Sequence, residues 1–312
     1  MRIVFMGTPG FAAGCLEALV QAGHNVAAAV SQPDRPKGRG HKVQPTPVHA
    51  CAQAHGIPIY QPQVIKNGEL EDVLQKAAPD VIVVVAYGKI LPESILNFPK
   101  YGCINVHASL LPKYRGAAPI QWSIINGERE TGITTMYMAQ GIDTGDMILK
   151  HAIPIAAEET AGTLHDKLMA LGAQTLIETL ERIENGTAPR EQQDDSQSCY
   201  APMIDKTTAL IEWDKSAQEI CNLIRGMNPS PFAYTTYKGA RMKIGTAAVS
   251  DVVPEAVPGT VLCAGRDGLL VCCADSALLV KTVQFDGKKM MPVGDYLAGH
   301  TIEEGTVLGR EE

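Results

Sequence analysis

The stretch DVIVVVA, at residues 80–86, decides the fold that we expect for this chain. Its five consecutive valine and isoleucine residues are typical of a strand that is covered on both faces, as the strands of a parallel sheet are. Apolar runs of strand length also lie at residues 2–6 and 25–30, and segments with helical spacing separate them. Because strands and helices alternate, the sequence predicts an α/β domain with a mostly parallel, Rossmann-like sheet.

The sequence changes in character after residue 189. Residues 190–198 are polar, which is typical of a linker, and short β-rich runs separated by glycines follow from Phe232 onward. Such runs are typical of a small barrel, and a chain of 312 residues exceeds the usual size of one core. We therefore expect an α/β domain at 1–189, a linker at 190–206 and a small OB-like β-barrel domain at 207–312.

Charge and cysteine usage narrow the class of protein. The net charge is −7 at pH 7, so an RNA-binding role requires a local basic patch. The eight cysteines are scattered without a C-x-x-C pair, which is typical of reduced thiols in a cytoplasmic protein rather than of disulfides or a zinc site. No apolar run has the length of a membrane span, and the first residues lack the layout of a signal peptide.

Three polar residues lie on one face of a strand predicted at residues 102–109. Side chains alternate along a strand, so Asn105, His107 and Ser109 point to the same side. Polar groups on a buried strand need partners or line a site. Because α/β folds bind ligands at the carboxyl ends of parallel strands, we favour a site here over a histidine that is satisfied within the core.

Two loops add charged residues. The loop GIDTGD, at residues 141–146, is either a turn that uses the backbone preferences of Asp and Gly or a functional loop in which Asp143 orients His107. The segment QPDRPKGRGHK, at residues 32–42, is either a solvated loop or an arm that binds phosphates. Its basic residues are Arg35, Lys37, Arg39 and Lys42.

The turn GTPG, at residues 7–10, follows the first predicted strand and presents amide groups at the start of a helix, which suits an anion. It does not match the G-x-G-x-x-G pattern of dinucleotide-binding proteins. Asp34 lies about where an acid binds the ribose in such proteins. A nucleotide-dependent oxidoreductase therefore stays open as an alternative to a simple turn in an α/β sheet.

Together these segments resemble the folate-dependent formyltransferases, and within that family the members that act on methionyl-tRNA. The resemblance spans the N-terminal domain in order, and Gly10 departs from the aspartate that the family commonly has there. The similar stretches are FMGTPGFA (5–12), SQPDRPKGRGHK (31–42), AYGKILP (86–92), INVHASLLPKYRGAAPI (104–120) and GIDTGDMI (141–148).

The resemblance implies that 10-formyltetrahydrofolate is the formyl donor and that the methionine amino group of initiator methionyl-tRNA is the acceptor. It implies no metal and no membrane, and we expect a cytoplasmic monomer. Asn105 and His107 would donate hydrogen bonds to the formyl oxygen, while Asp143 would hold His107 charged and take the ammonium proton.

The resemblance also assigns binding residues. The folate wall would consist of Ser109, Leu110, Leu111, Pro112, Tyr87, Ile90 and Leu91. The basic residues of the 32–42 segment would bind the acceptor stem of the tRNA. Further phosphate contacts are expected from the C-terminal domain, at Lys238, Arg241, Lys243, Lys288 and Lys289.

Three alternatives remain. A formyltransferase that acts on a sugar amine or a purine precursor would share the three catalytic residues, although the basic segment and the C-terminal domain favour tRNA. The oxidoreductase would bind a dinucleotide at residues 7–10. A non-catalytic RNA-binding protein would leave the polar strand face at residues 105–109 without a purpose.

Overall fold

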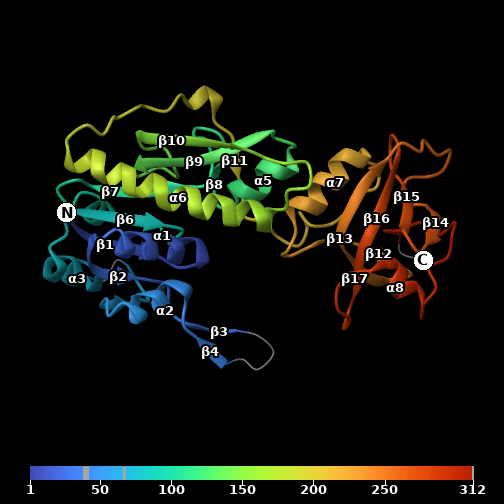
Figure 1. Cartoon of the computed structure of the whole chain (residues 1–312), viewed down its shortest axis with the longest axis horizontal. Helices are drawn as coiled ribbons and strands as arrows, with labels where there is room; N and C mark the ends of the chain where they lie inside the picture. The colour runs from blue at the N-terminus through green and yellow to red at the C-terminus, as the bar shows by residue number, and fades with distance from the viewer. Residues whose placement is uncertain (38–41, 66–67, 311–312) are drawn as a thin grey trace. The chain divides into compact units, whose positions relative to one another are not determined.

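The computed structural model describes residues 1–37, 42–65 and 68–310 of the chain (Figure 1). The chain divides into two compact units. The first comprises Met1–Pro119, Glu130–Ile153 and His165–Ala201, and the second comprises Ile120–Arg129, Pro154–Leu164 and Pro202–Glu312. Residues 190–201, expected as part of a linker, therefore lie within the first unit.

A seven-stranded sheet, in the order β10-β9-β7-β6-β1-β2-β5, forms the centre of the first unit. The pairs formed by β1, β2, β5, β6 and β7 are parallel, and β9 runs antiparallel to β7. The mostly parallel sheet predicted from the sequence is thus confirmed. The strands are β1 (Arg2–Gly7), β2 (Asn25–Val30), β5 (Ile59–Tyr60), β6 (Val81–Val85), β7 (Cys103–His107), β9 (Glu130–Tyr137) and β10 (Met147–Pro154).

The apolar stretch at residues 81–85 is the middle strand of this sheet, β6, and it is buried along its whole length. On one face, Val4, Ile82 and Val84 pack in a core with apolar residues of α3 (Glu69–Ala77) and α4 (Glu93–Leu96). On the other face, α6 (Ala161–Glu184) approaches Val106 and Phe11 at Gly172. Helices on both faces explain why β6 has no polar alternation.

Three further helices and several short elements complete the first part of the chain. Along the chain, α1 lies between β1 and β2, and α2 precedes β5. No helix among the described residues is long and apolar enough to cross a membrane. These elements are α1 (Gly10–Gln21), α2 (Pro47–Ala54), α5 (Pro119–Ile125), β3 (Arg35–Lys37), β4 (Lys42–Gln44), β8 (Arg115–Gly116), β11 (Tyr200–Ala201) and the 3-10 turn Asp195–Gln197.

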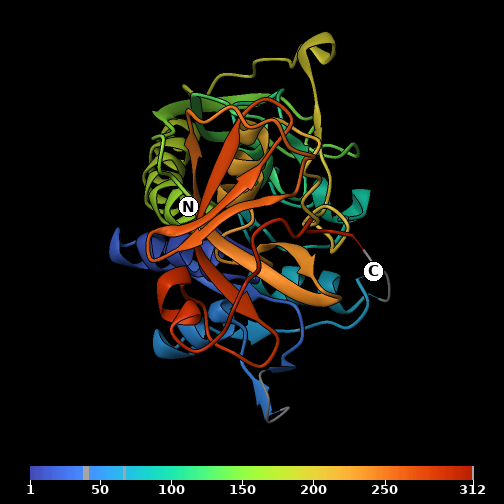
Figure 2. The ribbon, with the colours of Figure 1, turned by 90° about the vertical axis from the view of Figure 1, so that its right-hand side faces the viewer.

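The second unit contains an antiparallel sheet in the order β12-β13-β16-β15-β14, with β17 paired to β16 (Figure 2). Near the end of the chain, Val261 donates a backbone hydrogen bond to Thr306, and Gly309 donates one to Thr236. The last segment therefore joins the two ends of the strand order, which makes the sheet barrel-like, as predicted. The elements are β12 (Ala233–Tyr237), β13 (Ala240–Ser250), β14 (Val261–Gly265), β15 (Gly268–Cys272), β16 (Ala277–Phe285), β17 (Met291–Pro292), α7 (Ala217–Gly226) and α8 (Val293–Leu297).

Candidate active site

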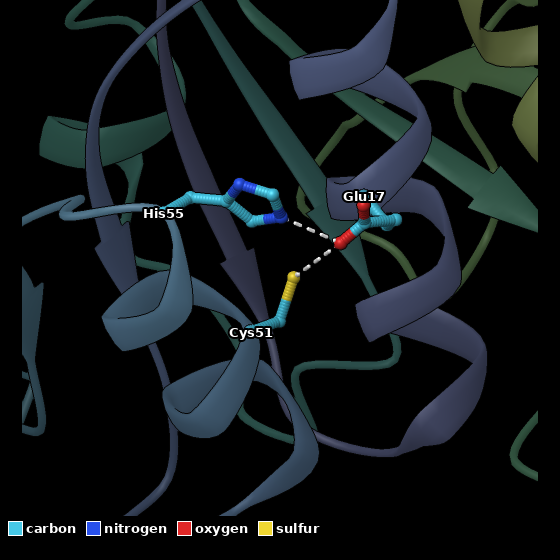
Figure 3. Close-up of side chains that lie close together, drawn as sticks. All are labelled: Glu17, Cys51 and His55. Carbon is cyan, nitrogen blue, oxygen red and sulfur yellow. Dashed lines mark hydrogen bonds and ion pairs between the residues drawn. The ribbon is translucent and has the colours of Figure 1, made fainter.

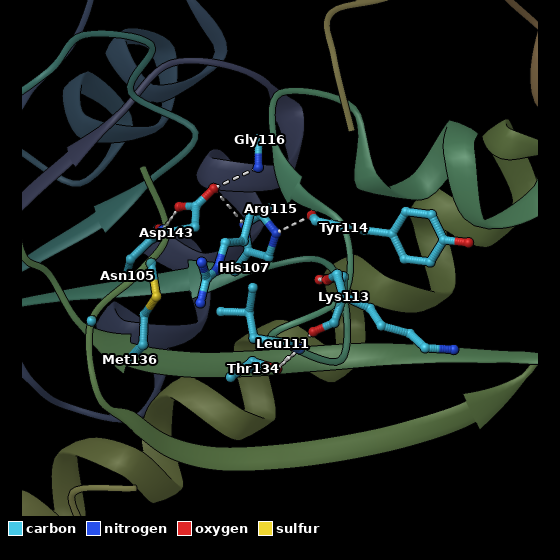
Figure 4. Close-up of polar contacts among 12 residues, drawn as sticks. Asn105, His107, Leu111, Lys113, Tyr114, Arg115, Gly116, Thr134, Met136 and Asp143 are labelled. Atoms are coloured by element: carbon cyan, nitrogen blue, oxygen red, sulfur yellow. Dashed lines mark hydrogen bonds and ion pairs between the residues drawn. The ribbon is translucent and has the colours of Figure 1, made fainter. Parts of the chain in front are cut away.

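Asp143 is the centre of a group of polar contacts just beyond the carboxyl end of β7 (Figure 4). Asn105 Nδ2 donates to Asp143 Oδ1 over 3.3 Å, and the backbone N–H of Gly116 donates to Oδ2 over 2.8 Å. His107 Nδ1 lies 3.6 Å from Oδ2. The fold thus brings together the three residues expected from the sequence to be catalytic.

His107 is buried, and both nitrogens of its ring face protein groups. Nε2 lies 2.8 Å from the backbone oxygen of Tyr114. A carbonyl oxygen only accepts hydrogen bonds, so Nε2 carries the hydrogen. Nδ1 faces the Asp143 carboxylate and donates to it only when the ring is protonated. For His107 to donate a hydrogen bond to a formyl oxygen, as expected, one ring nitrogen must therefore give up its contact with Tyr114 or Asp143.

The loop that carries Asp143 has a specialised backbone. Asp143 itself has φ 52°, in the left-handed region that residues with a side chain rarely adopt. At Gly145, a Cβ atom would lie 1.7 Å from the backbone oxygen of Tyr137, so the loop can approach β9 this closely only with glycine. Strained backbone of this kind is often found at functional sites, and here it points the carboxylate at Asn105.

Gln193 anchors this loop from the segment expected as a linker. Its side-chain N–H groups donate to the backbone oxygens of Asp143 and Gly145, both over 2.8 Å. Its carbonyl oxygen accepts from Nε and Nη2 of Arg115, at 3.0 and 2.8 Å. Gln193 is only 7% exposed. Sequence reasoning missed it because it lies in a run of similar polar residues and its partners lie about fifty or more positions away.

The residues proposed as a folate wall differ in burial. Tyr87 and Leu91 belong to the buried core, whereas Ile90 is 77% exposed. The Tyr87 hydroxyl has no hydrogen-bond partner among the described residues, and burial raises the pKa of Tyr87 to about 12. Leu110 and Pro112 are half-buried. Together with Ile90, they are the members of the set with apolar surface open to a ligand.

The two remaining members of the proposed wall are buried and shape the turn after β7. Ser109 donates from its hydroxyl to the backbone oxygen of Lys113 over 2.7 Å. The backbone N–H of Leu111 donates to the hydroxyl of Thr134 over 3.1 Å. Leu111 also forms a small apolar cluster with Met136 and Met147. These contacts fix the chain between His107 and Tyr114.

A cavity of about 610 Å³ opens beside the carboxyl ends of β1, β2 and β6. Its lining includes Thr8 and Pro9 of the GTPG turn, Arg35 of β3 and Tyr87 after β6. Lys89 also lines it, and its ammonium group donates to the backbone oxygens of Pro62 and Gln63, at 3.1 and 2.8 Å. Cationic side chains at the edge of a cavity suit a ligand that carries phosphate.

Asp34 supports one wall of this cavity from within the protein. Its carboxylate accepts hydrogen bonds from the side chain of Gln61, the ring of His49 and the backbone of Thr46. Burial raises the pKa of Asp34, but the hydrogen bonds from Gln61, His49 and Thr46 outweigh burial and lower the pKa overall. The oxygens expected to bind a ribose in an oxidoreductase are therefore used by the protein itself.

The basic segment at residues 32–42 contains β3 and the first residue of β4, and these two strands pair as a β-hairpin. Arg35 begins β3 and is exposed, and Lys37 pairs with Lys42 of β4 in the antiparallel ladder. Arg39 lies outside the described residues. The hairpin starts directly after Asp34, so the carboxylate that binds Gln61 and His49 fixes its base.

The second unit presents its own basic residues. On β13, Arg241 and Lys243 flank the buried Met242, so they point to the outer face of the sheet. The Arg241 guanidinium lies 4.2 Å from the centre of the Tyr234 ring. Lys243 pairs with Gln284 of β16, whose side chain donates to the backbone oxygen of Lys288. Lys288 and Lys289 are exposed, and Lys238 pairs with Glu303 at 2.7 Å.

Among the residues that the structure describes, one group of side chains could hold a metal ion. Glu17, Cys51 and His55 place their ligand atoms within 4.8 Å of one another on α1 and α2 (Figure 3). Burial, followed by the hydrogen bond and charge of Glu17, raises the pKa of Cys51 to about 11. A hydrogen bond from His55 is the largest of the effects that lower the pKa of Glu17.

Comparisons with known proteins match the chain along nearly all of its length. The profile of the family described as "Formyl transferase" matches residues 1–180, and that of "Formyl transferase, C-terminal domain" matches residues 203–301. The methionyl-tRNA formyltransferase of Geobacter sulfurreducens is 51% identical over 99% of this chain and 97% of the relative. That of Pelotomaculum thermopropionicum is 53% identical over 99% of both chains.

Solved structures share the fold at low sequence identity. HypX from Aquifex aeolicus in complex with tetrahydrofolic acid is 15% identical, with a TM-score of 0.66 over 98% of this chain and 50% of that chain. An N-formyltransferase from Helicobacter canadensis, in complex with folinic acid and dTDP-3-aminofucose, is 19% identical, with a TM-score of 0.65 over 91% of this chain and 99% of that chain.

Proposed function

The chain belongs to the methionyl-tRNA formyltransferase family, and we infer that it transfers a formyl group from a reduced folate to the methionine amino group of methionyl-tRNA. The chain shares about half of its residues with methionyl-tRNA formyltransferases, over both units, and this supports methionyl-tRNA as the acceptor above a sugar amine or a purine precursor. The observation that carries the chemistry is the convergence of Asn105, His107 and Asp143 at the end of β7.

The reaction joins the amine nitrogen to the formyl carbon and breaks the bond from that carbon to the folate nitrogen. Negative charge develops on the formyl oxygen during attack, and a hydrogen bond aimed at that oxygen stabilises the transition state by about 3 kcal/mol. Asn105 donates one N–H of its amide to Asp143. Its second N–H has no partner among the described residues and is suited to the formyl oxygen.

Asp143 is the proposed proton acceptor. The attacking amine becomes an ammonium group and must lose a proton before the product forms, and a nearby carboxylate accepts it directly or through a water molecule. Asn105, His107 and Gly116 hold the Asp143 carboxylate in place from three sides. His107 would be charged while Nδ1 donates to that carboxylate, which ties the two residues together as a pair.

We assign the donor as 10-formyltetrahydrofolate. The exposed apolar surface of Ile90 and the half-buried Leu110 and Pro112 are suited to the flat ring of a folate. Solved proteins of the same fold carry folates in their complexes, which supports the same class of donor. The proposed chemistry is carried by Asn105, His107 and Asp143 and uses no metal.

We assign the acceptor as initiator methionyl-tRNA, bound by a monomer in the cytoplasm. The cavity lined by Arg35 and Lys89 is suited to the phosphates at the end of the acceptor arm. The β3–β4 hairpin would bind the acceptor stem beside it. Arg241 and Lys243 on the outer face of β13 would add phosphate contacts from the second unit.

The direct test is transfer of labelled formyl from 10-formyltetrahydrofolate to charged initiator tRNA. Elongator methionyl-tRNA and an amino-sugar nucleotide serve as competing acceptors. We expect the initiator tRNA to be formylated fastest. Preferential labelling of the amino-sugar nucleotide would contradict the acceptor, and stabilisation against heat by NAD(H) but not by a folate analogue would contradict the donor.

A further inference from the structure

Glu17, Cys51 and His55 form a side-chain cluster between α1 and α2, outside the proposed active site (Figure 3). Cys51 and His55 lie four positions apart, one helical turn, so they share a face at the end of α2. Glu17 reaches them from α1. His55 Nε2 lies 2.7 Å from Glu17 Oε2, and Cys51 Sγ lies 3.5 Å from the same oxygen.

The spacing of these atoms is close to that of ligands on a small tetrahedral ion. Bonds of about 2.0 Å to nitrogen and oxygen and about 2.3 Å to sulfur place the ligand atoms of zinc roughly 3.3–3.5 Å apart. The sulfur–oxygen distance of 3.5 Å already agrees. The nitrogen–oxygen distance of 2.7 Å would have to increase by about half an ångström, which a side-chain rotation of a partly exposed glutamate allows.

The donor set selects the kind of ion. A thiolate, an imidazole and a carboxylate together favour zinc and similar divalent transition metals, whereas calcium and magnesium prefer oxygen ligands alone. The side chains of Glu17 and His55 are 40% and 30% exposed, so a fourth position remains open to water. Three protein ligands with one open position are a common arrangement around zinc.

Neighbouring groups hold the ligands in place. Gln21 donates to Glu17 Oε1 over 2.9 Å, which leaves Oε2 directed at Cys51 and His55. The Cys51 sulfur also lies 3.9 Å from the backbone oxygen of Ala13, in the preceding turn of α1. Such second contacts orient metal ligands and strengthen metal binding.

We propose that Glu17, Cys51 and His55 bind one zinc-class divalent ion, with water in the fourth position. The ion replaces the thiol proton of Cys51, which passes to solvent, and it ties α1 to α2. The N-terminus of α2 is capped by Thr46, which lines the cavity and contacts Ser31. The bound ion therefore steadies the elements that carry the β3–β4 hairpin. Binding of the ion at this site does not depend on formyl transfer.

The test begins with full-length protein stripped of metal and titrated with Co²⁺, then with Zn²⁺ in competition. We expect one equivalent of Co²⁺ to produce the strong visible bands of four-coordinate cobalt and a near-ultraviolet band from thiolate to cobalt. Zn²⁺ should remove both and raise the Tm. Absence of a thiolate band at one equivalent would overturn the proposal.

Four variants locate the site. Cys51→Ser should abolish the thiolate band, and Cys51→Ser, His55→Ala and Glu17→Gln should each weaken Zn²⁺ binding at least about tenfold. Cys263→Ser, which changes an exposed cysteine of β14, is the matched control and should bind as the parent does. A thiolate band that survives in Cys51→Ser, or that disappears in Cys263→Ser, would overturn the assignment. Because the three ligands are partly exposed, the metal-free Tm of each variant should stay close to that of the parent.

Discussion

Asp143 combines a left-handed backbone with a carboxylate that receives contacts from three sides. Strain of this kind costs of order 1–3 kcal/mol and persists only where surrounding contacts impose it. Here the contacts come from Asn105, Gly116 and His107 on one side of the loop and from Gln193 on the other. At the scale of single residues, the site is therefore a carboxylate held in a fixed direction.

Replacement of Asn105 tests the proposed oxyanion contact. Asn105→Ala should lower kcat about 10²- to 10³-fold with little change in KM, because the missing donor acts mainly in the transition state. Steady-state formyl transfer at saturating folate measures both constants. Asn97→Ala, at an exposed position after α4, is the control and should retain both. A change confined to KM would show that Asn105 serves ground-state binding.

Gln193 is expected to position the Asp143 loop. Gln193→Glu keeps an oxygen for Arg115 but turns a second oxygen toward the backbone carbonyls of Asp143 and Gly145. We expect kcat to fall at least about tenfold while the KM for tRNA changes less than about twofold, since small displacements of a catalytic group are costly.

The neighbouring exposed residue supplies the control for this substitution. Gln192→Glu adds the same charge one position away and should behave as the parent does. Equal activity of the two variants would contradict the positioning role of Gln193.

Some of these residues could be predicted from the sequence, and others could not. Asn105 and His107 follow from the two-residue period of a buried strand, which is a local signal. Gln193 has no such period, and its role arises because Glu191 pairs with Met147, and β11 pairs with β8, which brings the segment onto the loop. The sequence also did not predict which residues of the proposed folate wall are exposed. Ile90 and Leu91 are adjacent apolar residues, yet Ile90 is exposed and Leu91 is buried.

At the scale of elements, the β3–β4 hairpin carries basic residues in its sequence, and Arg35 at its start lines the cavity. Arg35→Gln combined with Lys37→Gln should weaken tRNA binding, because fewer phosphates are then neutralised by the protein. The slope of log affinity against log salt should become shallower by about 0.7 to 0.9 for each phosphate that the variant no longer neutralises. Binding measured over a series of salt concentrations gives this slope.

A lysine of the same unit controls for general charge. Lys76→Gln, at an exposed position in the last turn of α3, removes a positive charge far along the chain from the hairpin and should leave the slope unchanged. An unaltered slope in the hairpin variant would show that the hairpin does not contact the tRNA phosphates.

Long elements could be predicted and short ones could not. The strands β1, β2 and β6 have five or six residues that are mostly apolar, and burial on both faces favours such composition. By contrast, β8 and β11 contain two residues each. Two residues carry no periodic pattern, so their pairing depends on tertiary packing that the local sequence does not express.

At the scale of the whole molecule, each unit has a core of its own, and the outer face of β13 in the second unit carries Arg241 and Lys243. Arg241→Gln combined with Lys243→Gln should weaken tRNA binding several-fold at physiological salt and leave the single-turnover rate at saturating tRNA unchanged. Lys215→Gln, an exposed lysine that pairs with Glu212, is the control. A lower rate at saturation would contradict a role confined to binding.

The two-part architecture followed from the change in composition, because an α/β pattern and a run of short strands require different cores. Residues 120–129 and 154–164 belong to the second unit, and this could not be predicted from the sequence. These segments lie within the part of the sequence that has α/β character, and their packing is decided by contacts far away in the chain.

The most direct test of the proposed chemistry compares Asp143→Asn with the parent in single-turnover transfer of labelled formyl from 10-formyltetrahydrofolate to initiator methionyl-tRNA. Asp146→Asn removes the other carboxylate of the same loop and serves as the matched control. We predict that Asp143→Asn loses at least about 10² in rate at saturating substrates and binds tRNA normally, while Asp146→Asn retains the rate. Transfer by Asp143→Asn at the parental rate would contradict the role of Asp143 as proton acceptor.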